Sequence, residues 1–252
     1  MLPGNRSIGA GKLRVVGIGP GSRSLRTLAA QDAIADADVV VGYRTYIDLI
    51  ADLTEGKAVD TSGMRDETRR VMRAVNHALQ GKNVALVSSG DPGVYGMAGL
   101  ALEVCKQRDI AVDIEIIAGV TAANSAAALL GAPLSCDYCV VSLSDLLVPA
   151  EQILKRVRGA ASADFVTVLY NPVSGKRKQL IHDVRNVFLE FRSPQTPVGV
   201  VNRIGRAHES VEISTLRTFT HLVANMVTTV IIGNSQTELW HHRMITPRGY
   251  RL

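Results

Sequence analysis

Residues 84–99 read Val84-Ala-Leu-Val-Ser-Ser-Gly-Asp91-Pro92-Gly93-Val94-Tyr95-Gly96-Met97-Ala98-Gly99. An apolar run leads into a turn with one carboxylate, one proline and several glycines, and small residues then follow in a helical pattern. Such a strand–turn–helix sequence brings backbone N–H groups and one acid close to a ligand. Asp91-Pro92-Gly93 alone would be an ordinary turn. The longer run predicts a ligand-binding loop at the end of a buried strand.

Composition limits the classes of protein. The chain has 252 residues, of which 46% are apolar and only 4% aromatic, so the core is built mainly from Ala, Val, Leu and Ile. This length allows one large α/β domain or two of about 120 residues each. The formal charge of +5 favours an anionic partner. No Lys/Arg run is interleaved with aromatic residues, so we expect no nucleic acid, and a polycarboxylate small molecule fits as well.

The cysteines and the hydropathy indicate the compartment. Cys105, Cys136 and Cys139 are too few for a disulfide framework and are typical of a reducing compartment. Cys136-x-x-Cys139 lacks a second pair of ligands, and the six histidines show no metal spacing, so we expect no metal. Met1–Lys12 is polar, unlike a secretory signal, and no apolar stretch reaches the roughly 18–20 residues of a membrane span. The prediction is a cytoplasmic protein with no membrane partner.

Short apolar runs alternate with helical patterns, as in α/β proteins. In the segment 67–80, Val71, Val75, Ala78 and Leu79 share one helical face. The alternation around 112–116 predicts a half-exposed strand. The expected strands of the first half lie at 13–18, 38–41, 83–88 and 112–116. The expected helices lie at 24–37, 67–80 and 121–130, and a further helix of small residues follows the loop that begins after residue 88.

A break at Gly131-Ala-Pro133-Leu134 predicts a domain boundary. Beyond it the β pattern is more often paired, which favours a mixed sheet. The expected elements there are strands at 138–143, 164–169, 197–201, 210–213 and 227–232, and helices at 149–158 and 177–191. The predicted architecture is α/β and two-lobed, with the ligand cleft between the lobes. Its parts are a flexible N-terminus (1–12), an N-terminal lobe with a mostly parallel sheet (13–132), a C-terminal lobe with a mixed sheet (133–240) and a polar tail (241–252).

A second glycine-rich loop follows the first strand. It reads Gly17-Ile-Gly19-Pro20-Gly21-Ser22. A dinucleotide-binding fingerprint starting at Gly17 would need a third glycine at position 22, where the chain has Ser22, and Pro20 removes an N–H donor. A nicotinamide oxidoreductase is therefore disfavoured, and a titration with NADH would test it.

Three motifs together resemble one known family. Residues 89–96 resemble the Ser-Gly-Asp-Pro-x-x-Tyr-Gly signature of the tetrapyrrole (corrin and sirohaem) methyltransferases. The segment 17–21 resembles the Gly-x-Gly-Pro-Gly opening of that family. The segment 118–122 resembles its Pro-Gly-Val-Thr-Ala motif, although Ala118 replaces the proline. The resemblance runs in colinear order over residues 13–237.

Further segments resemble the members of the family that methylate C17 of precorrin-3B. These segments are Leu169-Tyr170-Asn171-Pro172-x-Ser174-x-x-Arg177, Ser142–Leu147 and Thr228–Ser235. Ala150 stands where a Trp is common, and Asn225 stands where an Asp is common. The resemblance implies methyl transfer to C17 of precorrin-3B with ring contraction to precorrin-4, in cobalamin biosynthesis. It also implies S-adenosyl-L-methionine as co-substrate, a precorrin-type polycarboxylate as substrate, and a homodimer.

The resemblance also assigns site residues. The expected cofactor-binding residues are Pro20, Ser89, Gly90, Asp91, Val94, Thr121, Ala122, Tyr170 and Asn171. Thr121 would equally suit a helix N-cap. Ring contraction needs a base for a C20 hydroxyl proton, and the candidates, in no firm order, are Asp91, Tyr95 and His208. Candidate clamps for substrate carboxylates are Arg23, Arg44, Arg65, Arg203 and Arg206, since arginine binds carboxylates with two parallel hydrogen bonds.

Two alternatives stay open. Within the family, the substrate could be the cobalt-loaded intermediate, or the methyl group could go to another corrin position. The second alternative is not an enzyme: a carrier protein with the same fold would bind the macrocycle and not S-adenosylmethionine. The intact Gly90-Asp91-Pro92 loop argues against the carrier.

Overall fold

A computed structural model describes residues 11–175, 177–223 and 225–251. The chain divides into two compact units, Met1–Thr121 and Ala122–Leu252, and each is described by itself. The predicted flexible N-terminus lies almost wholly outside the described residues. Lys12, its last residue, already belongs to the first strand.

The first unit is a parallel five-stranded sheet in the order β3-β2-β4-β1-β5. Its strands are β1 (Lys12–Gly17), β2 (Val39–Tyr43), β3 (Ala58–Ser62), β4 (Val84–Ser88) and β5 (Asp113–Ile117). Its helices are η1 (Arg23–Leu25), α1 (Leu28–Ala35), α2 (Arg44–Asp48), α3 (Ala51–Thr54), α4 (Glu67–Leu79) and α5 (Met97–Gln107). The prediction of a mostly parallel sheet is confirmed.

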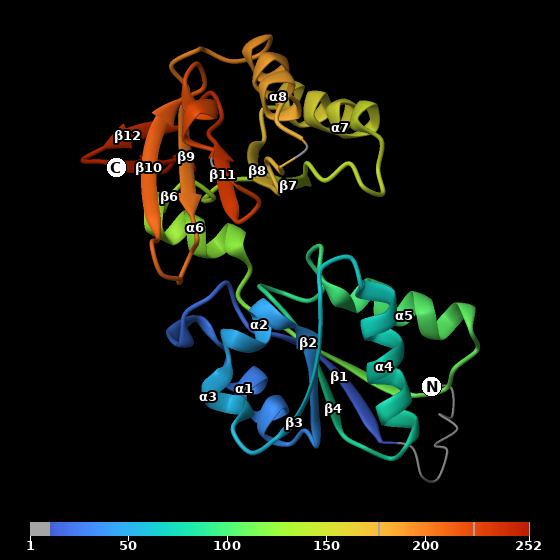
Figure 1. Cartoon of the computed structure of the whole chain (residues 1–252). Coiled ribbons are helices and arrows are strands. Elements are labelled where there is room, and N and C mark those ends of the chain that lie inside the picture. Colours follow the sequence, from blue (N-terminus) through green and yellow to red (C-terminus); the bar gives the residue numbers. More distant parts are fainter. Residues whose placement is uncertain (1–10, 176, 224, 252) are drawn as a thin grey trace. The chain divides into compact units, whose positions relative to one another are not determined.

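Helices cover both faces of this sheet. Figure 1 shows α4 and α5 on one side and α1, α2 and α3 on the other. Successive strand residues point to opposite faces, so Val15 packs with α4 and α5 while Val16 packs with α1 and α2. Because both faces are buried, the central strands read as continuous apolar runs instead of alternating.

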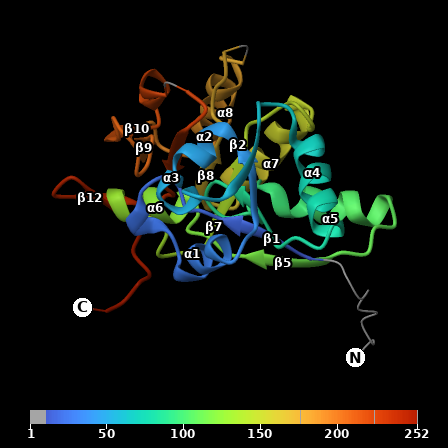
Figure 2. The same cartoon turned by 60° about the horizontal axis from the view of Figure 1, so that its bottom comes forward.

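The order of the strands creates a place for a ligand. The chain passes from β1 over β4 to β2, and from β4 over β1 to β5. The connections that follow these two neighbouring strands therefore run in opposite directions along the sheet. Figure 2 shows β5 next to β1 at the edge of the sheet. Two neighbouring parallel strands whose connections run in opposite directions form a switch point, and open α/β sheets bind their ligands outside the carboxyl ends of such strands. The loops after β1 and β4 are the two glycine-rich motifs of the sequence.

The second unit contains a mixed sheet in the order β10-β9-β11-β8-β7, as the paired β pattern predicted. Only β7 and β8 are parallel, and the other pairs are antiparallel. Its strands are β7 (Tyr138–Ser142), β8 (Val166–Tyr170), β9 (Pro197–Asn202), β10 (Ser210–Thr215) and β11 (Thr228–Ile232). A small sheet joins β6 (Gly131–Ala132), β12 (Glu238–Trp240) and β13 (Arg243–Ile245). The helices are α6 (Ala122–Leu130), α7 (Ala150–Ser162), α8 (Leu180–Leu189) and η2 (Phe219–Leu222).

The units divide between Thr121 and Ala122, whereas the sequence placed the boundary after residue 132. The helix α6 packs on the second sheet, where its fully buried Leu130 fills the space left by Gly199. A part of the expected tail also belongs to this unit, since β13 pairs with β6 and Met244 is fully buried. The sequence predicts that one face of α6 is apolar, but it does not predict which of the two sheets that face packs against.

The elements themselves differ little from those expected. The single helix expected over 24–37 is divided, because Thr27 is extended (φ −75°, ψ 151°) and its hydroxyl caps α1 by accepting from Ala30 N. The strand β3 and the short helices α2 and α3 were not predicted. β3 is an edge strand without a fully buried residue, so its apolar pattern is weak. In the described part of the chain, no helix is both long and apolar enough to cross a membrane.

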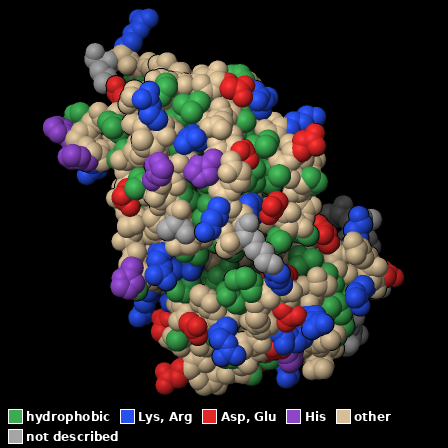
Figure 3. Space-filling view, turned by 45° about the horizontal axis from the view of Figure 1, so that its top comes forward, with side chains coloured by type: hydrophobic (Ala, Val, Ile, Leu, Met, Phe, Trp, Pro, Cys, Tyr) green, Lys and Arg blue, Asp and Glu red, His purple; other side chains and the backbone are tan. Residues whose placement is uncertain are grey.

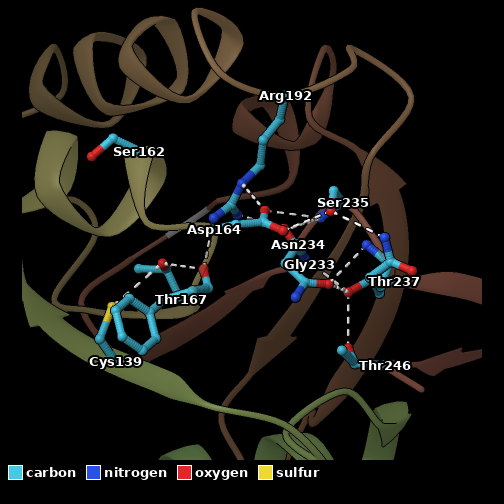
Figure 4. A network of polar contacts seen from close by, with 12 residues as sticks. Cys139, Ser162, Asp164, Thr167, Arg192, Gly233, Asn234, Ser235, Thr237 and Thr246 are labelled. Carbon is cyan, nitrogen blue, oxygen red and sulfur yellow. Dashed lines mark hydrogen bonds and ion pairs between the residues drawn. The ribbon is translucent and has the colours of Figure 1, made fainter. Parts of the chain in front are cut away.

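A buried arginine, Arg192, stabilises one end of the sheet in the second unit (Figure 4). Only 1% of the Arg192 side chain is exposed, and burial lowers the pKa of this group. It donates to the carbonyl oxygens of Gly233 and Phe165 and lies 3.5 Å from Asp164. Asp164 in turn accepts from the hydroxyl of Ser235 at 2.6 Å. These bonds tie the end of β11 to the start of β8, opposite the end at which Tyr170 lies.

Candidate active site

The loops after β1 and β4 are joined through their backbones. Ile18 N donates to Ser88 O at 2.9 Å and so continues the pairing of the two strands. Beyond it, Gly19 and Gly90 exchange two hydrogen bonds, of 3.2 Å from Gly19 N and 2.8 Å from Gly90 N. Both glycines have positive φ (74° and 67°), which a side chain would strain. The two glycine motifs of the sequence therefore form one structure at the carboxyl edge of the sheet.

Asp91 connects this structure to the loop after β5. Its Oδ1 accepts from Gly93 N at 2.8 Å, and its Oδ2 accepts from Gly119 N at 3.0 Å. Both carboxylate oxygens thus receive backbone N–H groups, which are charge-assisted hydrogen bonds. The structure brings together three segments, around residues 17–21, 89–96 and 118–121, that the sequence had only placed at separate strand ends.

Close approach of glycines makes this arrangement possible. A β-carbon at Gly119 would lie under 3.0 Å from Gly90 O and from Gly17 Cα. A β-carbon at Gly17 would be 2.7 Å from Gly119 N. These atoms are all backbone atoms, so the need for glycine here comes from tight packing of three loops.

The predicted cofactor residues of this unit lie along the joined loops. Gly90 and Pro20 are buried, and Ser89, Asp91, Val94 and Thr121 are half-buried. Tyr95 differs from them, since its side chain is 58% exposed and its φ is +53°. A tyrosine in the left-handed region is uncommon and is found most often at functional sites.

The second unit places Tyr170 and Asn171 at the carboxyl end of β8. The Tyr170 hydroxyl accepts from Ala123 N at 2.7 Å, in the first turn of α6. It satisfies one of the four N–H groups that a helix N-terminus leaves without a partner. Ala122, another predicted cofactor residue, begins the same helix. Asn171 has φ +51° and donates from Nδ2 to the hydroxyl of Ser142 at 3.0 Å.

We expect Tyr170→Phe to weaken the start of α6. The change removes the only hydroxyl oxygen and leaves the ring, so the free energy of unfolding should fall by about 1 kcal/mol. Denaturant unfolding measures this. Tyr138→Phe, at a 41% exposed tyrosine of β7, is the matched control and should unfold like the wild type. Equal stability of the two variants would contradict the role of the hydroxyl.

The remaining candidates lie in loops or at the starts of the short helices η1 and α2. His208 is exposed with φ +63° in the loop between β9 and β10. Of the candidate arginines, Arg206 is half-buried, and Arg23, Arg44, Arg65 and Arg203 are exposed. Arg23 Nε lies 3.8 Å from Asp52, so its charge is partly neutralised. Arg203, Arg206 and His208 share the loop between β9 and β10, whereas Arg23, Arg44 and Arg65 belong to the first unit.

Charges are mixed over the surface. Figure 3 shows Lys and Arg side chains interspersed with Asp and Glu over one face, without a single basic patch. An arginine hydrogen bond stabilises the charged form of Asp52, beside Arg26, and of Asp145, beside Arg177, and so lowers the pKa of both carboxyl groups. Among the described residues, no group of three or more His, Cys, Asp or Glu side chains could hold a metal ion.

One buried cation at the carboxyl edge of the first sheet was not predicted from the sequence. Arg70 is 3% exposed, donates to the Ser62 hydroxyl and the Gly63 carbonyl, both at 2.7 Å, and lies over the ring of Tyr43. It therefore ties the ends of β2 and β3 together. A signal was present: Arg70 lies four and eight residues before Ala74 and Ala78, on the apolar face of α4.

The first unit is thus an open parallel α/β sheet with joined glycine-rich loops at its switch point, and the second is a mixed α/β unit. The chain matches the model of one family, described as Tetrapyrrole (Corrin/Porphyrin) Methylases, over residues 12–220, and it belongs to this family. The methyltransferase resemblance predicted from the sequence is confirmed.

Relatives and solved structures agree with this placement. The chain is 46% identical over 96% of its length to a cobalt-factor III methyltransferase of Priestia megaterium, of which it spans only 45%. It is 45% identical over 95% of its length to a probable cobalt-factor III C(17)-methyltransferase of Salmonella typhimurium, which it covers completely. The crystal structure of the methyltransferase CobJ is similar with a TM-score of 0.89 and 35% identity, over 94% of this chain and 100% of that one.

Proposed function

We propose that the chain transfers the methyl group of S-adenosylmethionine to C17 of a precorrin-3B-type tetrapyrrole, with ring contraction to the precorrin-4 level, in cobalamin biosynthesis. The observation that carries this proposal is the 45% identity to a relative named for C(17)-methylation, over that relative's whole length. The motifs shared with C17 enzymes also come together, since Asn171 binds Ser142 and Arg177 binds Asp145.

The strand ends of the first unit fit a ligand such as S-adenosylmethionine. Each of the loops after β1, β4 and β5 contains at least one glycine, so a ligand can approach the backbone closely there. The sulfonium supplies an electrophilic methyl group when bound. The work left to the protein is to align donor and acceptor and to exclude water. We propose that Pro20, Ser89, Gly90, Asp91, Val94 and Thr121 of the first unit, and Ala122, Tyr170 and Asn171 of the second, do this.

Ring contraction also needs a group that takes a proton from the C20 hydroxyl. Both carboxylate oxygens of Asp91 already accept amide hydrogen bonds, so we propose that Asp91 holds the loops. Tyr95 or His208, which are exposed, then takes the proton. In Tyr95→Phe or His208→Gln, loss of the base should leave S-adenosylmethionine affinity unchanged and slow contraction, which NMR of the product detects. Wild-type contraction in both variants would contradict this assignment.

A cobalt-loaded ring is the second candidate substrate, because the relatives of Priestia megaterium and Salmonella typhimurium are named for cobalt-factor III. We propose in addition that the chain acts as a homodimer in the cytoplasm, with neither nucleic acid nor a membrane as partner. Size-exclusion chromatography with light scattering tests the dimer.

The test is an anaerobic incubation of the protein with S-adenosylmethionine and either precorrin-3B or its cobalt-loaded counterpart, followed by mass spectrometry. A gain of one methyl group in step with S-adenosylhomocysteine is expected, and NMR maps the methyl group to C17. Methylation of only one ring identifies the substrate. Failure to bind S-adenosylmethionine at all would overturn the proposal and leave a tetrapyrrole carrier.

A further inference from the structure

Arg177 is buried in a loop, where an arginine is normally solvated. Only 10% of its side chain is exposed. Its Nη2 donates to the carbonyl oxygen of Asn171 at 2.6 Å, and its Nη1 donates to Oδ1 of Asp145 at 2.8 Å. Its Nε is buried and has no hydrogen-bond partner among the described residues. The side chain has exchanged hydration for two particular acceptors, and burying a charged group in this way is favourable only when its hydrogen bonds are well formed.

The two acceptors belong to different loops. Asn171 directly follows β8, and Asp145 lies between β7 and α7. The strands β7 and β8 are parallel, so these loops begin side by side. The bond from Asn171 Nδ2 to the Ser142 hydroxyl joins them a second time. Arg177 therefore closes a bridge between the two segments that resemble C17-methylating enzymes.

One of the residues that the bridge holds, Asn171, has an uncommon backbone conformation. Asn171 has φ +51°, and asparagine tolerates this region better than most residues. Its carbonyl oxygen then accepts from the Arg177 guanidinium, and its side-chain amide donates to Ser142. Both groups are used inside the protein, so the orientation of the turn depends on these partners.

We propose that Arg177 is a positioning residue, whose guanidinium holds the carbonyl of Asn171 and the carboxylate of Asp145 so that the two loops keep one arrangement for binding. The inference rests on the proposed function, in which Tyr170 and Asn171 contact S-adenosylmethionine. The Asp145 loop also carries Leu146 and Leu147, which are 69% and 96% exposed. The ion pair fixes the base of this apolar segment, which suits contact with the apolar faces of a tetrapyrrole.

The geometry requires arginine. A guanidinium presents N–H groups in a rigid fork and can serve a carbonyl and a carboxylate at once. A lysine ammonium at the same place keeps the charge but concentrates it at one point on a flexible stem. Arg177→Lys should therefore loosen one of the two bonds without removing the positive charge.

We expect Arg177→Lys to raise the calorimetric Kd of S-adenosylmethionine by about tenfold, the loss of one charged hydrogen bond. The KM of the tetrapyrrole should rise as well. The matched control is Arg158→Lys, because Arg158 makes a two-bond ion pair with Glu190 in the same unit, with both side chains half-exposed. Its Kd and KM should equal those of the wild type.

A second variant keeps the inference testable if Arg177→Lys does not fold. Asp145→Asn leaves the bond from Arg177 to Asn171 and removes only the negative charge, so Kd and KM should rise, but less. A merely structural role would lower Tm while the folded protein kept its Kd. Wild-type Kd and KM in the folded variants would overturn the inference. If the wild type itself bound no S-adenosylmethionine, the proposed function would fail instead.

Discussion

Gly119→Ala is expected to weaken the binding of S-adenosylmethionine strongly and to destabilise the first unit. The new β-carbon would lie under 3.0 Å from Gly90 O and Gly17 Cα. Neither atom can move without separating the loops after β1, β4 and β5, since backbone hydrogen bonds join the first two loops and the Asp91 carboxylate holds the third. We expect the free energy of unfolding to fall by about 3 kcal/mol, the upper part of the range for overpacking. If this cost falls on the loops that form the site, the affinity should fall about 100-fold, because each 1.4 kcal/mol is a factor of ten.

Calorimetry and denaturant unfolding measure these two effects. The matched control is Gly99→Ala in α5, where a β-carbon meets open space. Alanine there should leave the affinity unchanged and stabilise the helix by about 0.5–1 kcal/mol. If Gly119→Ala bound S-adenosylmethionine with wild-type affinity, the close packing of the three loops would not be needed for the site.

Asp91→Asn is expected to have the second-largest effect. The amide side chain has the same shape, but it carries one acceptor oxygen and one NH₂ group. One of the two backbone donors, Gly93 N or Gly119 N, would then face another donor instead of an acceptor. Leaving a half-buried N–H without its partner costs about 1–3 kcal/mol of stability. The affinity for S-adenosylmethionine should fall about tenfold or more, since each 1.4 kcal/mol is a factor of ten.

The control is Asp113→Asn, at an exposed aspartate that begins β5, and it should behave like the wild type. The measurement also separates two roles of Asp91. Weaker binding together with lower stability supports its role in holding the loops. Unchanged binding together with a slower reaction would instead make Asp91 the base for ring contraction.

The site could be predicted in part from the sequence. Glycines and one aspartate after apolar strands identify the loops, because few other residues permit such turns. The contacts between the loops could not be predicted. Asp91 is 28 residues from Gly119, its hydrogen-bond partner, and its turn also suits an ordinary Asx motif. The burial of Arg177 could not be predicted either, because the neighbouring sequence does not distinguish a solvated arginine from one that bridges two loops.

By itself the sequence determined the α/β class, most strands and helices and the mixed second sheet, because apolar periodicity and turn residues are local properties of the chain. The family followed from the resemblance of the loop motifs to known methyltransferases. Tertiary structure alone decided where the units divide, since α6 packs on the second sheet through Leu130 and Gly199. It also decided that part of the expected tail is a strand, and that Asp91 and Arg177 hold loops together. These features depend on contacts between residues far apart in the chain, which the order of the strands creates.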